Sequence, residues 1–188
     1  MNETNIKQGS GRAIGLRFGI ITGVLYAILL FFRYHFFASN PLSFGLFAVI
    51  SYIIILMMYL FTGIARKKEL GGFADYKDIF TSIFIAILIT EAAYILFNLI
   101  YLRFVDPSFW ENFRTNSLSY LQKKGLTDEQ IEQQMKGMKD LDKQTKTWAL
   151  IKGYGYSVII DCIFGFIFTA ILRRKKPVFE ELPADTKL

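Results

Sequence analysis

Two carboxylates, Glu91 and Asp161, are the residues whose type and position could do chemistry, because each falls inside a long apolar stretch. An ionisable group at the centre of a bilayer costs roughly 2.5 to 3.5 kcal/mol, so such residues face a bundle interior and mark ion or proton sites. Glu91 lies 13 residues after Asp78, and Asp161 lies 12 residues before Arg173. At about 1.5 Å of helical rise per residue, both fall roughly 18 to 20 Å from one boundary. We therefore expect the two carboxylates at similar depth.

Polar side chains accompany each carboxylate at helical spacing. The two stripes are Glu91, Tyr94, Asn98 and Tyr101, and Tyr154, Ser157, Asp161, Gly165 and Thr169. Carboxylates a few Å apart do not both ionise cheaply, so a shared proton or a bound cation is one hypothesis. A structural ion pair or hydrogen-bonded cluster is a second, since Arg33 could reach toward Glu91, and residues facing a partner subunit are a third. The candidate intramembrane polar cluster is Glu91, Asp161, Tyr94, Asn98 and Arg33.

Other chemistry has little support in the sequence. His35 is the only histidine and Cys162 the only cysteine, so a histidine or cysteine metal site and a Ser-His-Asp triad are not expected. The sequence has no P-loop, dinucleotide fingerprint or zinc-protease motif. We predict no catalytic residue, no cofactor and no metal site, and hence a protein that is not an enzyme.

The elements that position the two carboxylates are apolar spans. The 188-residue chain is 53% hydrophobic and 20% charged. Its apolar residues gather in four blocks, Phe18 to Phe37, Leu42 to Ile64, Ile79 to Phe104 and Trp148 to Leu172. Each is long enough for a hydrocarbon core that needs about 20 helical residues, and none has the polar face of a helix in a soluble bundle. The sequence predicts an all-α integral membrane protein with four transmembrane helices.

The basic residues lie beside the ends of these spans. They are Lys7, Arg12 and Arg17, then Arg66, Lys67, Lys68 and Lys77, and finally Arg173, Arg174, Lys175 and Lys176. All three clusters fall on one side of a four-span chain, which the positive-inside tendency identifies as the cytoplasm. The net charge of +6 is therefore a topology signal and does not indicate nucleic-acid binding. We predict a multi-pass protein of the bacterial inner membrane with both termini in the cytoplasm.

This topology divides the chain into three parts. Residues 1–12 form a short mobile or interfacial cytoplasmic segment, 13–176 the transmembrane domain, and 177–188 a cytoplasmic tail. Residues 105–147 lie outside as a helical hairpin between the third and fourth spans.

Helix signals in this hairpin are specific. Asp106 can cap a helix whose first residue is Pro107, Gly125 can end that helix, and Thr127 with Gln130 matches a capping box. Apolar residues follow helical spacing in both halves: Phe109, Trp110, Phe113, Leu118 and Leu121, then Ile131, Met135, Met138 and Leu141. These stripes either pack on each other and on the membrane surface or dock an extracytoplasmic protein.

Small residues recur every four positions in the first span. The candidate helix-packing face is Gly11, Gly15, Gly19, Gly23 and Ala27. This spacing places them on one helix face, where another backbone can approach closely. The partner helix could belong to the same chain or to a second copy.

The order of three motifs resembles a known family. Gly71-Gly72-Phe73 with Tyr76-Lys77 precedes the third span, Phe104-Val105-Asp106-Pro107-Ser108-Phe109 follows it, and Arg173-Arg174-Lys175-Lys176 ends the fourth. Together they look like a family of small bacterial membrane proteins known as domain of unknown function 4199, over most of the chain. The resemblance implies a four-helix inner-membrane protein. It implies no activity, substrate or catalytic residue.

Two functional hypotheses follow. The first is a non-enzymatic subunit or accessory of a membrane assembly, acting through helix packing and the outer hairpin. Its partners would be the lipid bilayer, a second copy or another membrane protein, and an extracytoplasmic protein at 105–147. The alternative is a small oligomeric carrier coupled to protons or cations through Glu91 and Asp161. Many transporters have internal repeats, and the two halves of this chain show no convincing similarity.

Overall fold

The computed structural model describes residues 3–138 and 147–175. Within these residues the chain is all-helical apart from one isolated β-bridge. Four helices are long and apolar enough to cross a membrane, which confirms the predicted all-α class with four spans. They are α1 (Glu3–Phe36), α2 (Pro41–Glu69), α3 (Tyr76–Ile100), which the π-helix η1 (Tyr101–Val105) continues, and α6 (Thr147–Leu172). Between α3 and α6 lie two shorter helices, α4 (Phe109–Lys123) and α5 (Asp128–Lys136).

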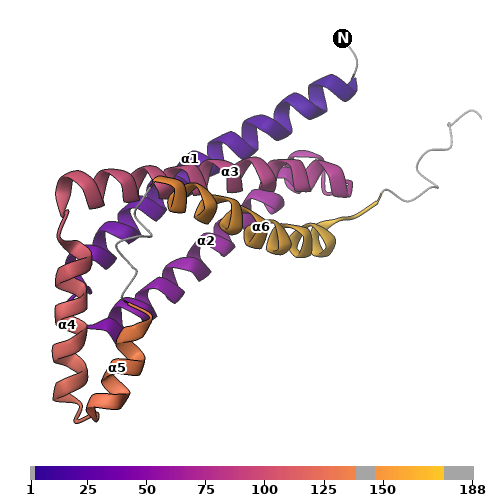
Figure 1. The fold of residues 1–188 in the computed structure, drawn as a ribbon. Coiled ribbons are helices and arrows are strands. Elements are labelled where there is room, and N and C mark those ends of the chain that lie inside the picture. The colour runs from indigo at the N-terminus through magenta and orange to yellow at the C-terminus, as the bar shows by residue number, and fades with distance from the viewer. Residues whose placement is uncertain (1–2, 139–146, 176–188) are drawn as a thin grey trace, which may run out of the picture.

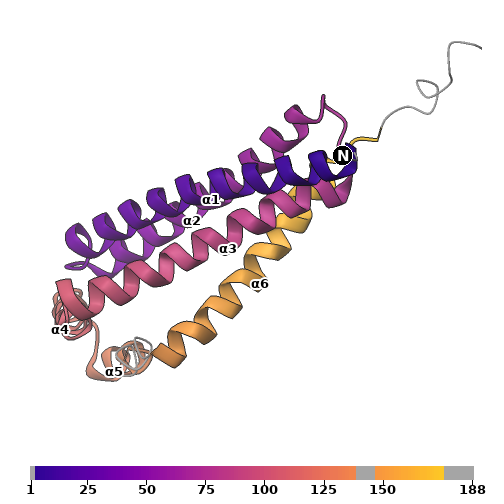
Figure 2. The same ribbon diagram turned by 90° about the horizontal axis from the view of Figure 1, so that it is seen from above.

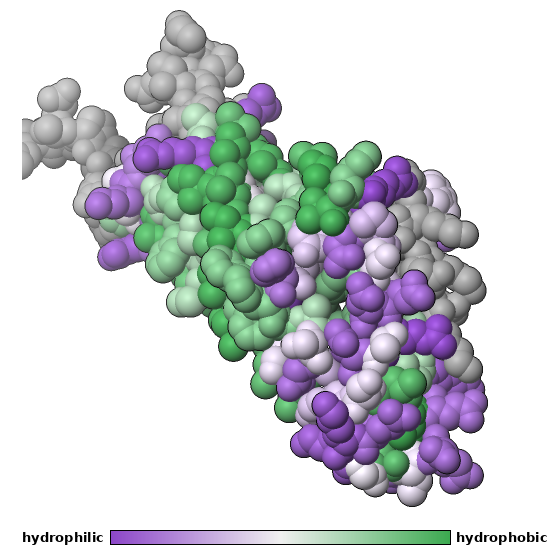
Figure 3. All heavy atoms as spheres, turned by 90° about the vertical axis from the view of Figure 1, so that its left-hand side faces the viewer, coloured by the Kyte–Doolittle hydropathy of each residue, from purple (hydrophilic) through white to green (hydrophobic). Residues whose placement is uncertain are grey.

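The four spans run between two ends of the molecule (Figures 1 and 2). One end, called the basic end here, holds the start of α1, the α2–α3 connection and the end of α6, with Arg66, Lys67, Lys68, Arg173 and Arg174. The opposite end, called the hairpin end, holds α4 and α5. Figure 3 shows a band of apolar side chains between hydrophilic surfaces. This distribution is the one expected of a bundle surrounded by lipid.

The first helix is longer than its apolar span. It begins at Glu3, whereas its apolar block starts at Phe18. At the hairpin end, Asn40 caps α2, because its side-chain oxygen accepts hydrogen bonds from the backbone N–H groups of Leu42 at 3.0 Å and Ser43 at 3.4 Å.

The connection from α3 to α4 differs from the prediction. Residues 101–105 form the π-helix η1, whose turn is wider than that of an α-helix. The N–H of Asp106 donates to the carbonyl of Tyr101 at 2.8 Å. Asp106 therefore ends the third span, whereas we predicted that it caps a helix beginning at Pro107. Helix α4 instead begins at Phe109, with Ser108 at its N-cap position.

The second half of the hairpin follows its sequence signals. Gly125 has a φ of 73° just after α4, a left-handed conformation in which glycine has no steric cost. The predicted capping box is confirmed: the N–H of Gln130 donates to Thr127 Oγ1 at 3.4 Å, and the N–H of Thr127 donates to Gln130 Oε1 at 3.1 Å. Met138 follows the end of α5, and Leu141 lies outside the described residues.

Three apolar clusters form the core. The first lies in α2 and α3 and in the connection between them, and consists of Ile55, Tyr59, Ala74, Ile79, Ile83, Ala86 and Ile87. The second joins α4 to α1, α2 and η1 through Tyr34, Phe44, Tyr101, Phe109 and Phe113. The third joins α4 to α5 through Leu121, Ile131 and Met135. The apolar stripes of α4 and α5 thus pack on each other and on the ends of the spans.

The glycines of α1 face α3. A Cβ added at Gly15 would lie 2.6 Å from the backbone oxygen of Ser82. Added at Gly19 or Gly23, it would lie 2.9 Å from the Cβ of Ile89 or Ala93 respectively. The two backbones therefore approach at a distance that only glycine allows. The predicted packing face finds its partner within this chain along residues 15–23.

The two ends of this face differ from its middle. Gly11 lies against α2, where an added Cβ would be 3.0 Å from the guanidinium carbon of Arg66. Ala27 is half-buried. The hydroxyl of Ser82 also donates to the carbonyl of Gly11 at 2.9 Å, so a hydrogen bond reinforces the close packing of α1 on α3.

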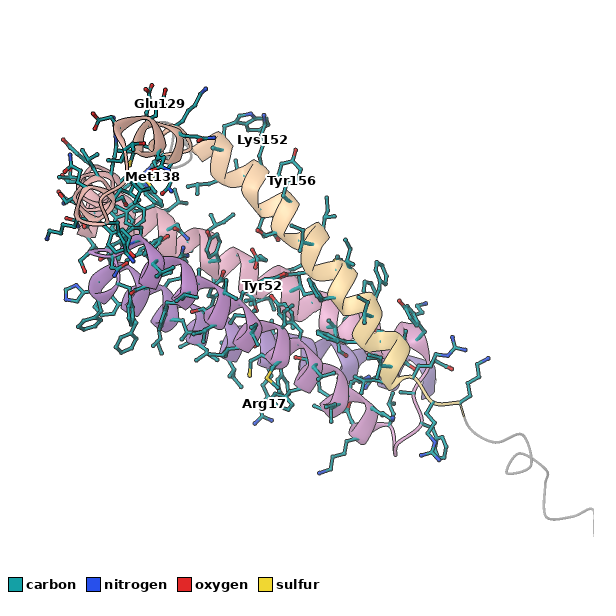
Figure 4. All side chains as sticks on the ribbon, turned by 90° about the horizontal axis from the view of Figure 1, so that it is seen from below. Arg17, Tyr52, Glu129, Met138, Lys152 and Tyr156 are labelled. Atoms are coloured by element: carbon teal, nitrogen blue, oxygen red, sulfur yellow. The ribbon has the colours of Figure 1, made fainter. Side chains whose placement is uncertain are left out.

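Helix α6 is held mainly at the basic end. The backbones of Ala74 and Arg174 exchange hydrogen bonds at 3.0 and 3.2 Å. Gly165 also packs closely on α3, because a Cβ added there would lie 3.2 Å from a methyl carbon of Ile83. Toward the hairpin end α6 diverges from the other spans (Figures 2 and 4). In this half of α6 Trp148 is 67% exposed and Ile151 is 53% exposed, and the hydroxyl of Tyr154 donates to the carbonyl of Leu88 at 3.5 Å.

Candidate functional site

Glu91 of α3 and Asp161 of α6 meet in the interior of the spans. Their carboxyl groups are close enough to interact, and they are only 3% and 1% exposed. Each lies on the polar stripe that the sequence predicts, and the antiparallel course of α3 and α6 brings the two carboxyl groups to the same depth. The pair is buried in an environment where a lone charge is costly.

Hydroxyl groups complete the surroundings of the pair. The hydroxyl of Tyr52 donates to Asp161 Oδ1 at 2.8 Å, and that of Tyr59 donates to Asp161 Oδ2 at 3.0 Å. Ser157 lies four residues before Asp161, on the same face of α6. Tyr59 is fully buried, whereas Tyr52 is half-buried and occupies the region between α2 and α6 (Figure 4). The carboxyl pair therefore links three spans, α2, α3 and α6.

The geometry has a direct chemical consequence. Ionised carboxylates are acceptors only, so a hydrogen bond between two carboxyl groups requires a proton on one of them. The tyrosine hydroxyls donate to Asp161 and can stabilise negative charge there. The arrangement can hold one proton and one negative charge.

The remaining members of the predicted cluster lie elsewhere. Asn98 accepts a hydrogen bond from the hydroxyl of Tyr34 at 2.6 Å. The guanidinium of Arg33 donates to the carbonyl of Phe44 at 3.2 Å and lies 3.9 Å from the centre of its ring. Both residues thus belong to the aromatic cluster at the hairpin end.

Tyr94 lies between this aromatic cluster and the carboxyl pair. Its ring stacks on that of Tyr26 with centroids 5.2 Å apart. The five residues of the predicted cluster therefore divide into a carboxyl pair, a tyrosine stack and a separate aromatic network. Arg33 engages the aromatic network and is not the partner that the structure gives to Glu91.

The two tyrosines of α2 were absent from the predicted site. Their spacing of seven residues, two helical turns, places Tyr52 and Tyr59 on one face of the second span. Tyr59 also lies seven residues before Arg66, near the middle of that span. Because the sequence does not show which span faces α2, this signal became informative only once the structure placed Asp161 opposite these tyrosines.

Oxygen ligands are the only metal chemistry that the pair offers. In the described part of the chain, no group of three or more His, Cys, Asp and Glu residues gathers in one place. Two carboxyl groups with neighbouring hydroxyls could accept a hard cation, which takes oxygen ligands. The pair has fewer carboxylates than dedicated divalent sites have.

Four apolar spans with a buried carboxyl pair between them define a multi-pass helical membrane protein whose environment is a lipid bilayer. Residues 17–174 match the family described as protein of unknown function DUF4199, and the chain belongs to this family. The match confirms the resemblance seen in the three motifs. Comparison with curated proteins and with solved structures found no match.

Proposed function

We propose that the protein binds and releases a proton at the Glu91–Asp161 pair and that this exchange changes how α6 packs on α2 and α3. The observation that carries the proposal is the burial of the two neighbouring carboxyl groups between α3 and α6, with two tyrosine hydroxyls donating to Asp161. A small cation that displaces the proton would act in the same way. This is the proton- or cation-coupled hypothesis of the sequence analysis, now with the α2 tyrosines added.

Loss of the shared proton would have a large local effect. Two unit charges 4 Å apart repel by about 4 kcal/mol at an effective dielectric constant of 20. The backbone bridge between Ala74 and Arg174 holds α6 at the basic end, while residues at the hairpin end, such as Trp148, are exposed to the surroundings. We therefore expect the repulsion to displace the half of α6 nearest the hairpin end.

Infrared difference spectroscopy on the purified protein in lipid tests proton binding. We expect a protonated-carboxyl band that disappears at alkaline pH and is absent from both Glu91→Gln and Asp161→Asn. Glu129→Gln, which changes an exposed carboxylate on α5, is the control and should keep the band. A spectrum that neither carboxyl variant alters contradicts the proposal.

A vesicle assay separates a carrier from a proton-responsive protein without transport. Under an imposed proton gradient, a carrier would acidify vesicles at a rate that Glu91→Gln abolishes and Glu129→Gln leaves unchanged. Spin labels on α2 and on the exposed half of α6 would report the helix movement in the same vesicles. A distance that is independent of pH would contradict the coupling to α6.

We further propose that the basic end lies in the cytoplasm of a bacterium and that the membrane is its inner membrane, with α4 and α5 outside. The support is the asymmetry of the basic residues. In a Cys162→Ser background, a membrane-impermeant maleimide should label Glu129→Cys in intact cells and leave Lys68→Cys unlabelled. The opposite labelling pattern would reverse the orientation.

A role as a subunit of a membrane assembly is the second candidate, and α6 supports it. The glycines of α1 at 15–23 and most of the described stripe residues of α4 and α5 are packed within the chain, whereas no atom of the described residues lies within 4 Å of a Cβ added at Gly153 or Gly155 of α6. Tyr156 beside them is 69% exposed (Figure 4). Cross-linking in mild detergent tests this candidate, and a strict monomer with no co-purifying protein would count against it.

A further inference from the structure

A polar cavity lies at the basic end, where α1, α2 and α3 meet. Its volume is about 210 Å³, and it is lined by Gly11, Arg12, Arg66, Lys77, Asp78 and Thr81. None of these residues takes part in the Glu91–Asp161 pair. The cavity is therefore a separate candidate site.

Positive charge dominates this cavity. Three of its lining residues are basic and one is acidic. Arg66 is 1% exposed and is held in place by Glu69 at 2.6 Å and Asp78 at 3.6 Å. Arg12, Arg66 and Lys77 carry three positive charges, and Asp78 and Glu69 carry two negative charges. The excess of one positive charge favours an anionic ligand.

The wall beneath these cations is rigid. Gly11 lets the guanidinium of Arg66 lie directly against α1, because a Cβ there would be only 3.0 Å from its central carbon. The hydroxyl of Thr81 is bonded to the carbonyl of Lys77 at 2.7 Å, so its oxygen lines the cavity as an acceptor. Because Arg12 and Lys77 are exposed, their side chains are the donors available to a ligand.

The depth of the cavity matches that of a lipid headgroup. The apolar block of α1 begins at Phe18, that of α2 ends at Ile64, and that of α3 begins at Ile79, so the charged lining residues flank all three blocks. The cavity therefore lies at the boundary between the hydrocarbon core and the aqueous phase. Basic pockets between transmembrane helices at this level suit phosphate-containing headgroups.

An apolar track leads from the cavity toward the middle of the membrane. Leu16, Ile20 and Val24 follow Arg12 at intervals of four residues on α1, and they are 53%, 52% and 57% exposed. Residues at this spacing share one helix face. An acyl chain could lie along this track while its phosphate contacts Arg12, an arrangement that soluble phosphate could not use.

We propose that this cavity binds the phosphate of an anionic phospholipid, with Arg12 and Lys77 as its ligands and the Arg66 guanidinium as a fixed positive wall. The basic side chains would recognise a phosphate group, and the apolar track on α1 indicates that this phosphate belongs to a lipid. The site is independent of proton binding at the Glu91–Asp161 pair.

Native mass spectrometry of the full chain, released from vesicles that contain equal phosphatidylglycerol and phosphatidylcholine, tests the proposal. We expect the wild-type protein to retain phosphatidylglycerol selectively. The double substitution Arg12→Gln with Lys77→Gln should reduce that retention roughly tenfold or more, since each basic residue near the surface contributes about 1 kcal/mol. Lys68→Gln with Arg173→Gln removes the same charge from exposed positions that do not line the cavity, and should retain the lipid.

Equal loss of lipid in the two double variants would overturn the proposal, because only the overall charge would then matter. A second measurement distinguishes the source of phosphate. If inorganic phosphate protects the detergent-solubilised protein against thermal unfolding as well as phosphatidylglycerol does, the lipid assignment is wrong. Circular dichroism of both double variants should show unchanged helix content, since Arg12 and Lys77 are exposed.

Discussion

Two contacts of α3 differ in kind, the one with α1 and the one with α6. Against α1, glycines bring the backbones together over Gly15, Gly19 and Gly23, and the hydroxyl of Thr90 donates to the carbonyl of Gly19 at 3.5 Å. Against α6, the contact includes the buried carboxyl pair and the backbone bridge of Ala74 with Arg174. In the first contact, the three glycines and the α3 residues that they touch include no ionisable side chain. The second contact has the two carboxyl groups of Glu91 and Asp161 at its centre.

The difference assigns separate roles to the two contacts. Close packing through small residues is the means by which membrane helices associate without a hydrophobic driving force, so α1 and α3 should form a fixed unit. The α6 contact has the carboxyl pair at its centre. At the basic end the backbone bridge between Ala74 and Arg174, called the clamp here, holds α6 in place, and the opposite end of α6 is exposed. It should be the part of the molecule that responds to protonation, and each prediction below tests one side of this contrast.

The largest effect is expected from Gly15→Leu. Its Cβ would lie 2.6 Å from the backbone oxygen of Ser82, so α1 and α3 would have to separate. Overpacking of this kind costs about 1 to 3 kcal/mol, which unfolding in mixed micelles can measure. Gly45→Leu is the matched control, because Gly45 has no atom within 4 Å of an added Cβ. Equal stability of the two variants would show that the glycine contact is not needed.

A smaller effect is expected from Gly72→Ala, which acts on the clamp of α6. Gly72 has a φ of 88°, and a side chain in a left-handed conformation costs about 1 to 2 kcal/mol. The loop before Ala74 should loosen, and hydrogen exchange should increase at the end of α6 but not in α1. Gly137→Ala, at an open position with a φ of −68°, should change neither. Exchange that rises equally in α1 and α6 would remove the distinction between the two contacts.

The contrast also explains what the sequence could predict. Span length and basic flanks are local properties, so four helices, the capping box at Thr127 and the matched depth of Glu91 and Asp161 follow from composition and spacing. The glycine interval identifies a packing face on α1 but contains no information about its partner. That partner depends on which helices are neighbours, which only the three-dimensional structure gives.

The prediction was weakest where a side chain has several polar neighbours within reach. Arg33 could extend toward Glu91, but the carbonyl and ring of Phe44 lie closer to its helix end and satisfy it there. Likewise Asp106 had the right type for a helix cap, and the π-turn of η1 placed it at the end of the preceding helix. Both errors come from competition between alternative partners, which sequence spacing does not rank.

The tyrosines of α2 allow a finer test of the polar contact. Tyr59→Phe removes a hydroxyl that donates to Asp161 from a fully buried position, whereas Tyr52→Phe removes one from a half-buried position. Hydrogen bonds between membrane helices contribute about 0.6 kcal/mol on average. We expect Tyr59→Phe to cost at least this much and Tyr52→Phe less, with both costs disappearing in an Asp161→Leu background. Costs that persist in that background would mean that the hydroxyls act on another group.

The smallest effect is expected from Arg174→Gln. The guanidinium of Arg174 lies 5.3 Å from the centre of the Phe73 ring, and such a contact at an exposed site contributes about 0.5 kcal/mol. The backbone of Arg174 keeps its bridge to Ala74 in this variant, so the clamp should weaken without opening. In lipid, the unfolding temperature of Arg174→Gln should therefore be slightly lower than that of Arg173→Gln, which removes the same charge from the adjacent position. A loss as large as that of Gly72→Ala would mean that the side chain of Arg174, and not the backbone bridge, holds the end of α6.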